Sequence, residues 1–218
     1  MRIDLPIKAS STALFLNGER RSAVAVYQLV KRYDKVIAVD GAWNTFSKLK
    51  LEQYIDWVLG DGDSIIEKPA QFIELSDQNY TDFEKVLCLL IAEGCRRVDV
   101  FWASGGEMDH FLGHLSVAAK YAEQIQCYFF DDKQCFFYLA ENCQLIDGQK
   151  QSGGRNISIY PFPEALVSSQ GLLYDMDRLL LQQNGRQSLR NVTTGNQVEI
   201  VLDGSAFVFV DILSHKLT

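Results

Sequence analysis

The amino-acid sequence predicts an α/β domain followed by a smaller all-β domain, on two observations. In the first 131 residues, short apolar runs alternate with stretches whose apolar residues recur at helical spacing. After Asp131, short apolar segments follow one another without a helical period, separated by Gly, Asn, Asp, Ser and Pro. The first pattern favours a parallel sheet covered by helices on both faces, and the second favours an antiparallel β-sandwich. We therefore expect an α/β domain over residues 1–131 and a β-sandwich domain over residues 132–218.

The elements of the first domain are expected from their apolar patterns. The expected strands are residues 13–16, 36–39, 55–59, 72–75, 98–103 and 126–130, and the expected helices are residues 20–33, 81–93 and 108–123. Thr81 and Glu84 fit a capping box, which predicts that the second of these helices begins at Thr81. Gly94 is the expected C-cap of the same helix.

The elements of the second domain are expected to be short strands. They are predicted over residues 135–139, 143–146, 156–160, 166–169, 178–182, 197–202 and 206–210.

Composition excludes several classes of protein. The 218 residues carry 21 Lys and Arg against 28 Asp and Glu, a formal charge of −7, which argues against broad nucleic-acid binding because that needs a basic face. The longest apolar run, Val86–Ala92, is far shorter than the roughly 18 residues that span a bilayer, and the start of the chain predicts no export signal. Five cysteines without a CxxC pair are typical of reduced thiols, so we expect a cytoplasmic protein with no membrane partner.

Polar residues gather directly after the expected strands of the first domain. Asn17-Gly18, Asp40-Gly41, the segment Gly60–Ser64 (GDGDS) and Ser104-Gly105-Gly106 each follow one. In a parallel sheet these points all lie at the carboxyl edge, where such folds bind ligands. We therefore predict the functional site at this edge.

The segment from Asp77 to Lys85 has two interpretations. A helix that begins at Thr81 presents free backbone N–H groups and the positive end of its dipole, which together form an anion site, and Lys85 adds a cation one turn later. Alternatively, Asp82 only suits the start of a helix and Lys85 is solvated.

The acids of this edge favour a metal site. Asp40, Asp61, Asp63, Asp82 and Asp109 are expected to converge if the strands are correctly predicted. Crowded carboxylates repel one another unless a cation lies between them. Hard oxygen ligands beside an anion site indicate Mg²⁺ and nucleotide-phosphate chemistry.

The segment from Gly105 to His114 adds a glycine pair and two histidines. Paired glycines let backbone amides approach a polyphosphate closely. His110 and His114 are four residues apart on an expected helix, which suggests a transition-metal site, but no Glu lies between them and no third His is near. The favoured interpretation is that His110 forms hydrogen bonds in the site and His114 packs or faces solvent.

Together these motifs resemble those of the thiamin pyrophosphokinase family over nearly the whole chain. The matching residues are Asn17-Gly18, Asp40-Gly41-Ala42 with Asn44, Gly60–Ser64, Asp77-Gln78 with Thr81-Asp82-Phe83 and Lys85, and Gly105-Gly106 with Asp109-His110. The resemblance implies a Rossmann-like catalytic domain before a β-sandwich domain, with transfer of the β,γ-pyrophosphoryl group of ATP to the thiamin hydroxyl. It also implies a homodimer that holds thiamin between the catalytic domain of one subunit and the sandwich domain of the other.

The resemblance also implies a role for each matched residue. Asp61, Asp63 and Asp82 would bind Mg²⁺, and Asp40 and Asp109 would complete the acidic site beside Asp82. The remaining residues of the substrate sites would be Asn17, Gly41, Asn44, Gln78, Thr81, Lys85, Ser104, Gly105, Gly106 and His110, with Ser188 and Asn191 of the second domain on the thiamin side. The chain departs from the family pattern at Glu107, at His114 and at Arg190, which stands where a Ser is expected.

Two other functions remain open from the sequence. The same acids could serve a metal-dependent phosphohydrolase, in which water replaces the alcohol. A regulator that binds a nucleotide or thiamin without turnover is the non-enzymatic alternative.

Overall fold

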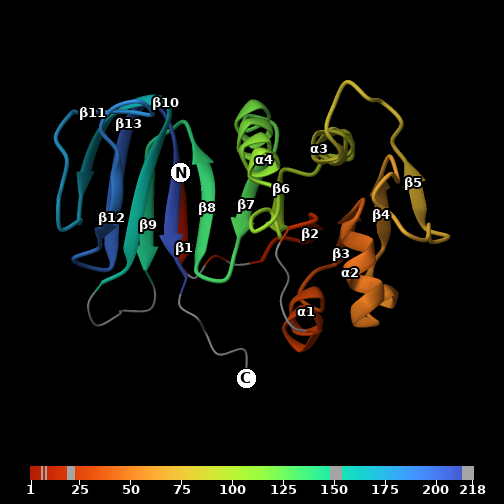
Figure 1. Cartoon of the computed structure of the whole chain (residues 1–218). Coiled ribbons are helices and arrows are strands. Elements are labelled where there is room, and N and C mark those ends of the chain that lie inside the picture. The colour runs from red at the N-terminus through yellow and green to blue at the C-terminus, as the bar shows by residue number, and fades with distance from the viewer. Residues whose placement is uncertain (6, 8, 19–22, 148–153, 213–218) are drawn as a thin grey trace. The chain divides into compact units, whose positions relative to one another are not determined.

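The computed structural model describes residues 1–5, 7, 9–18, 23–147 and 154–212 (Figure 1). Its described residues form two compact units. One unit contains residues 9–131, and the other contains the N-terminal strand together with residues 132–212. Among these residues no helix has the length and the apolar character needed to cross a membrane.

The unit of residues 9–131 is built on a parallel sheet. Its strands lie in the order β7-β6-β2-β3-β4-β5, and every printed pair among them is parallel. The strands are β2 (Thr12–Phe15), β3 (Lys35–Val39), β4 (Trp57–Gly60), β5 (Phe72–Glu74), β6 (Arg97–Phe101) and β7 (Gln126–Phe130). The strand order reverses at β2, which lies between β3 and β6, and ligands bind parallel sheets at such a switch point.

Helices cover both faces of this sheet. The helices α1 (Ala23–Val30) and α2 (Ala42–Leu49) lie on one face, and α3 (Asp82–Ala92) and α4 (Met108–Lys120) lie on the other (Figure 1). Alternate residues of each strand point to opposite faces, so Ala13 and Phe15 pack with α2 residue Phe46 in one core cluster. Burial on both faces explains why these strands are almost continuous apolar runs.

The helices differ in part from those predicted. Of the helix expected over residues 20–33, the described part is α1, and residues 20–22 lie outside the described residues. Helix α2 was not predicted, although Trp43, Phe46 and Leu49 are spaced as the apolar face of a helix. It begins directly after Gly41, and its buried residues include Trp43 and Phe46. The short 3₁₀ helix η1 (Glu52–Tyr54) follows it.

The other unit is a set of mainly antiparallel strands. It contains β1 (Arg2–Leu5), β8 (Gln134–Leu139), β9 (Cys143–Asp147), β10 (Asn156–Gln170), β11 (Leu179–Gln182), β12 (Ser188–Val192) and β13 (Gln197–Asp211). The strand β1 pairs in parallel with β9, so the first residues of the chain belong to this unit and not to the α/β domain that the sequence predicted. That pairing joins segments some 140 positions apart, which local pattern does not predict.

Two long strands replace four predicted short ones. Residues 156–160 and 166–169 are parts of β10, and residues 197–202 and 206–210 are parts of β13. The two strands pair along most of their length, with a shift of register between Pro161 and Ala165. At the shift, Gly204 has a φ of 109°, and a Cβ there would lie 2.5 Å from the carbonyl oxygen of Glu164. The polar and glycine residues therefore mark a bend within a strand, where the sequence pattern indicated a break.

The bend gives each long strand two sets of neighbours. The first part of β13 pairs with β9 and its last part pairs with β8. In the same way, the first part of β10 pairs with β12 and a later part pairs with β11.

Candidate active site

The carboxyl edge of the parallel sheet contains a pocket of about 530 Å³. It lies where the segments after β2, β3, β4 and β6 meet the first turns of α3 and α4. Its lining residues are Leu16, Asn17, Gly18, Val39, Asp40, Asp61, Ser64, Tyr80, Thr81, Asp82, Phe83, Ala103, Gly106, Glu107, His110 and His114. The topology alone brings these chain segments together, because the strands are parallel and end at one edge.

Three carboxylates of the pocket form one group. Asp40, Asp61 and Asp82 each offer a carboxylate oxygen, and these oxygens lie within 4.8 Å of one another. Each acid comes from a different segment: Asp40 follows β3, Asp61 follows β4, and Asp82 begins α3. A set of hard oxygen donors at this spacing suits Mg²⁺ better than a thiol- or imidazole-binding metal.

Asp40 is held in an unusual backbone conformation. Its φ is 43°, in the left-handed region that costs a non-glycine residue free energy, and the residue is buried. Its N–H donates to the Leu59 carbonyl at 2.8 Å, and its Oδ1 accepts the N–H of Gly62 at 3.1 Å. The carboxylate is therefore fixed against the turn that carries Asp61.

Asp82 lies at the start of α3 as the sequence predicted. Thr81 caps the helix, because its side-chain oxygen accepts the N–H of Glu84 at 3.3 Å. Only half of the predicted capping box forms: the Glu84 carboxylate accepts instead from Lys120 at 2.6 Å and from Tyr121 at 2.9 Å, on α4 and at its C-terminal end. Burial raises the pKa of Asp82, and the adjacent Lys85 ammonium opposes this shift.

Backbone groups approach closely on the other side of the pocket. The N–H of Gly18 donates to the Trp102 carbonyl at 2.8 Å, which ties the segment after β2 to the segment after β6. A Cβ on Gly106 would lie 3.4 Å from the Cα of Gly18. Trp102 and Gly105 both have positive φ angles, 58° and 79°. These close approaches leave backbone amide groups, rather than side chains, at the pocket wall.

A second acidic group lies at the start of α4. Glu107, Asp109 and His110 are all exposed, and the His110 Nδ1 lies 3.0 Å from a carboxylate oxygen of each acid. The hydrogen bond with His110 lowers the pKa of Asp109, and the same contact raises the pKa of His110. Glu107 and His110 line the pocket, whereas Asp109 is 84% exposed and does not join the group of Asp40, Asp61 and Asp82.

His114 is the less exposed of the two histidines. Burial lowers its pKa to about 4, so its imidazole is neutral at pH 7. Its ring meets Phe83 edge to face, with centroids 5.2 Å apart. The structure thus places both histidines in the lining of the pocket, with His110 exposed and His114 packed against Phe83.

Other predicted residues lie near the pocket but do not line it in the described structure. Asn44 binds the loop after β4, donating to the Ser64 carbonyl at 2.7 Å and accepting from Ile66 N–H at 3.0 Å. Asp63 is exposed, and its N–H donates to Asp61 Oδ1 at 3.1 Å. The residues outside the lining are Gly41, Asn44, Asp63, Gln78, Lys85, Ser104, Gly105 and Asp109.

Ser188 and Asn191 lie in the other unit, on β12. Asn191 is buried, and its side chain holds the segment before β11: its Oδ1 accepts the Tyr174 N–H at 3.1 Å and its Nδ2 donates to the Tyr174 carbonyl at 2.8 Å. Arg190 is exposed with a φ of 55°, and its N–H donates to Ser158 Oγ at 2.9 Å. The Tyr174 side chain is itself 72% exposed.

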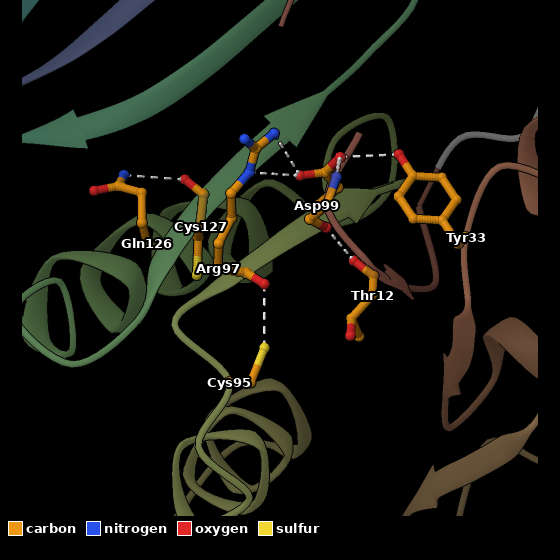
Figure 2. Close-up of polar contacts among 8 residues, drawn as sticks. Thr12, Tyr33, Cys95, Arg97, Asp99, Gln126 and Cys127 are labelled. Atoms are coloured by element: carbon orange, nitrogen blue, oxygen red, sulfur yellow. Dashed lines mark hydrogen bonds and ion pairs between the residues drawn. The ribbon is translucent and has the colours of Figure 1, made fainter. Parts of the chain in front are cut away.

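A further buried carboxylate, Asp99 on β6, lies outside the pocket lining (Figure 2). It is fully buried, and its carboxylate lies 2.9 Å from the Tyr33 hydroxyl, which donates to it, and 3.2 Å from Arg97 (Figure 2). It also accepts the Ser10 N–H at 3.0 Å. These partners precede β2 and β3 or begin β6, so the cluster lies at the amino edge of the sheet. Burial raises the pKa of Asp99. Asp99 therefore joins β6 to the segments that precede β2 and β3.

Sequence reasoning missed several residues of the pocket. Tyr80 adjoins the predicted site residue Thr81, and this adjacency was the available signal. Glu107 was noted only as a departure from a family pattern, and it lies at the rim beside His110.

A parallel α/β unit with carboxylates that converge at the carboxyl edge of its sheet is typical of enzymes that transfer phosphate-containing groups. Residues 26–129 match the family model described as "Thiamin pyrophosphokinase, catalytic domain". Thiamin pyrophosphokinase 1 of Caenorhabditis elegans is 27% identical over 217 residues, covering 92% of this chain and 88% of that protein. Both comparisons relate this chain to the thiamin pyrophosphokinase family, which is a family of kinases.

Solved structures of that family share the fold. The thiamin pyrophosphokinase of yeast superposes with a TM-score of 0.81 at 17% identity, covering 99% of this chain and 92% of that one. The thiamin pyrophosphokinase of Candida albicans gives a TM-score of 0.79 at 16% identity, covering 97% and 92%. These likenesses show a mixed α/β fold along nearly the whole chain.

Proposed function

We propose that this protein is a Mg²⁺-dependent thiamin pyrophosphokinase. In the proposed reaction the thiamin hydroxyl oxygen bonds to the β-phosphorus of ATP, the bond from that phosphorus to the α-phosphate oxygen breaks, and AMP leaves. The hydroxyl proton passes to a carboxylate of the site, so the products are thiamin diphosphate and AMP. The observation that carries the proposal is the convergence of Asp40, Asp61 and Asp82 in one pocket, within the residues that match the thiamin pyrophosphokinase catalytic-domain model.

The metal site is assigned to these three carboxylates. Their oxygens lie within 4.8 Å of one another, and the group contains neither thiol nor imidazole, which fits a hard divalent cation. When bound, Mg²⁺ supplies positive charge that neutralises the phosphates as they transfer. The chain's own part is to hold the carboxylates before the metal arrives, and the backbone of Asp40 is held for this in a costly conformation.

The phosphate site is assigned to the N-terminus of α3 and to two glycines that line the pocket. Thr81 lines the pocket at the N-terminus of α3, where free N–H groups and the helix dipole favour an anion. Gly18 and Gly106 line it with backbone rather than side chain. His110 also lines the pocket. Its contact with Asp109 raises its pKa, so its imidazole stays positively charged up to a higher pH than that of an ordinary histidine.

The thiamin site is assigned on charge and on resemblance. Thiamin carries a permanent positive charge, and an acidic pocket attracts such a substrate.

We further propose a Rossmann-like catalytic domain followed by a β-sandwich domain, in a homodimer whose sandwich domain contributes Ser188 and Asn191 to the thiamin site of the partner. The five cysteines are free thiols, which supports the proposal of a reducing, cytoplasmic location.

Product analysis tests the reaction. Incubation with ATP, Mg²⁺ and thiamin should give equal amounts of AMP and thiamin diphosphate by ³¹P NMR. Stoichiometric ADP would show transfer of a single phosphoryl group. Consumption of ATP at the same rate without thiamin would favour the phosphohydrolase, and binding of both substrates without product would favour the regulator.

A further inference from the structure

Lys85 is a buried cation that does not line the pocket in the described structure. Its side chain is only 7% exposed, one turn into α3. Its ammonium forms an ion pair with Asp82 Oδ1 at 2.8 Å and donates a hydrogen bond to the Leu75 carbonyl at 2.8 Å. Burying an ammonium is costly unless it is paired, and these two contacts compensate that cost.

The hydrogen bond from Lys85 to Leu75 connects it indirectly to the segment that carries Asp61. Leu75 follows β5, and its N–H donates to the Gly60 carbonyl at 2.8 Å. Gly60 directly precedes Asp61 in the chain. One ammonium therefore links the helix that carries Asp82 to the strand end that adjoins Asp61.

The geometry points away from a direct contact between Lys85 and phosphate. Asp82 lines the pocket and is 20% exposed, whereas its Oδ1 is inaccessible to solvent and lies against Lys85. The ammonium thus contacts the buried oxygen of this carboxylate, which leaves the other oxygen for the pocket.

We propose that Lys85 is a positioning residue, which fixes the Asp82 carboxylate relative to Asp61 so that both can bind one divalent ion. The expected effect of Lys85 on turnover rests on the proposed function, whereas its expected effect on metal binding does not. It differs from the role that the family resemblance implied, in which Lys85 holds phosphate. The two roles predict different effects on the metal and on ATP.

Binding of Mn²⁺ to the nucleotide-free protein tests the proposal. In Lys85→Met, electron paramagnetic resonance should show Mn²⁺ binding at least tenfold weaker than in the wild type, because Asp82 is no longer held. With substrates, kcat should fall while the KM for ATP stays within about twofold. Lys85→Arg keeps the charge and the donors and should restore most of the Mn²⁺ affinity. Lys120→Met is the control. Lys120 lies on α4 and pairs with Glu84, the neighbour of Lys85 on α3, and its loss should leave Mn²⁺ binding unchanged.

Other outcomes overturn the proposal. Unchanged Mn²⁺ binding with a raised KM for ATP would make Lys85 a phosphate ligand, and tighter Mn²⁺ binding would make it only a counter-ion that competes with the metal. Thermal unfolding monitored by circular dichroism establishes that each variant is folded, and Lys85→Gln is measured in the same way if Lys85→Met does not fold. The Mn²⁺ measurement needs no substrate, so failure of the proposed reaction and failure of this proposal are separate results.

Discussion

The Asp40 carboxylate accepts the backbone N–H of Gly62 at 3.1 Å, so the acid that follows β3 is tied to the turn that follows β4. This hydrogen bond joins segments that are 22 residues apart and that meet only because their strands are parallel neighbours. It fixes the spacing between Asp40 and Asp61 before any ligand binds. The candidate metal site is therefore organised by the backbone of the turn as well as by its side chains.

Gly62→Ala should destabilise the protein and reduce activity. Gly62 has a φ of 82°, and an L-residue in the left-handed region costs roughly 1–2 kcal/mol. A Cβ there would also meet the end of the flexible Lys68 side chain, 2.4 Å from its Cε, which can move aside. Urea unfolding should show a loss of about 1–2 kcal/mol.

Gly113→Ala is the matched control for Gly62→Ala. Gly113 lies inside α4, with no atom within 4 Å of an added Cβ. Alanine is favoured over glycine in a helix by about 1 kcal/mol, so this variant should gain stability. Equal stability losses in the two variants would contradict the argument from φ.

Asp82→Asn should abolish turnover, and it should also lower stability because the buried Lys85 ammonium loses its charged partner. The amide retains the size of the carboxylate but removes the negative charge that the divalent ion needs, and we expect kcat/KM to fall at least a thousandfold. The exposed Asp34→Asn is the same chemical change outside the pocket lining and should leave activity within twofold. An Asp82→Asn variant with retained activity would remove this residue from the metal site.

The stability of the protein should depend on pH through Asp99. Burial raises the folded-state pKa of Asp99, so the folded protein keeps this proton to a higher pH than the unfolded chain does. The contribution of Asp99 to the free energy of unfolding therefore falls as the pH rises from the unfolded pKa through the folded pKa. Asp99→Asn removes this dependence, so its stability deficit relative to the wild type should be larger at pH 4 than at pH 7.

Urea unfolding of both proteins at pH 4, 5, 6 and 7 measures this difference. A deficit that grows as the pH rises would mean that the hydrogen bonds from Tyr33 and Ser10 outweigh burial and lower the pKa of Asp99.

Asn191→Ala should destabilise the unit that contains β12. The Asn191 side chain is buried and makes two hydrogen bonds to the backbone of Tyr174, and removing it leaves those groups unsatisfied. Such a loss costs about 1–3 kcal/mol. Asn196→Ala, in the loop before β13, should change stability by less than about 0.5 kcal/mol. Chemical unfolding of the two variants measures the contrast, and equal effects would show that the Tyr174 contacts add no stability.

Sequence reasoning succeeded where one local property decided the outcome. The strands of the parallel sheet are buried on both faces, so each is an apolar run that can be recognised alone, as Ala13–Leu16 and Val36–Val39 were. The cap at Thr81 is likewise set by four consecutive residues.

The failures involve segments whose partners lie far away in the chain. Strand β1 was missed because its partner β9 is about 140 residues away. Helix α2 is a different case, because its buried residues Trp43 and Phe46 follow helical spacing and this local signal was overlooked. The bends in β10 and β13 resemble chain breaks in sequence, and only pairing with each other shows that the strands continue.

The sequence by itself determined that acids and glycines follow the strands of a parallel sheet, because strand periodicity and turn residues are local properties of the chain. Only the tertiary structure decided which of those acids meet: Asp40, Asp61 and Asp82 share the pocket, while Asp63 and Asp109 turn to solvent. It also decided that Lys85 contacts Asp82 and Leu75 within the protein. The physical reason is that strand register and helix packing set the direction of each side chain, and these depend on contacts between residues that are distant in sequence.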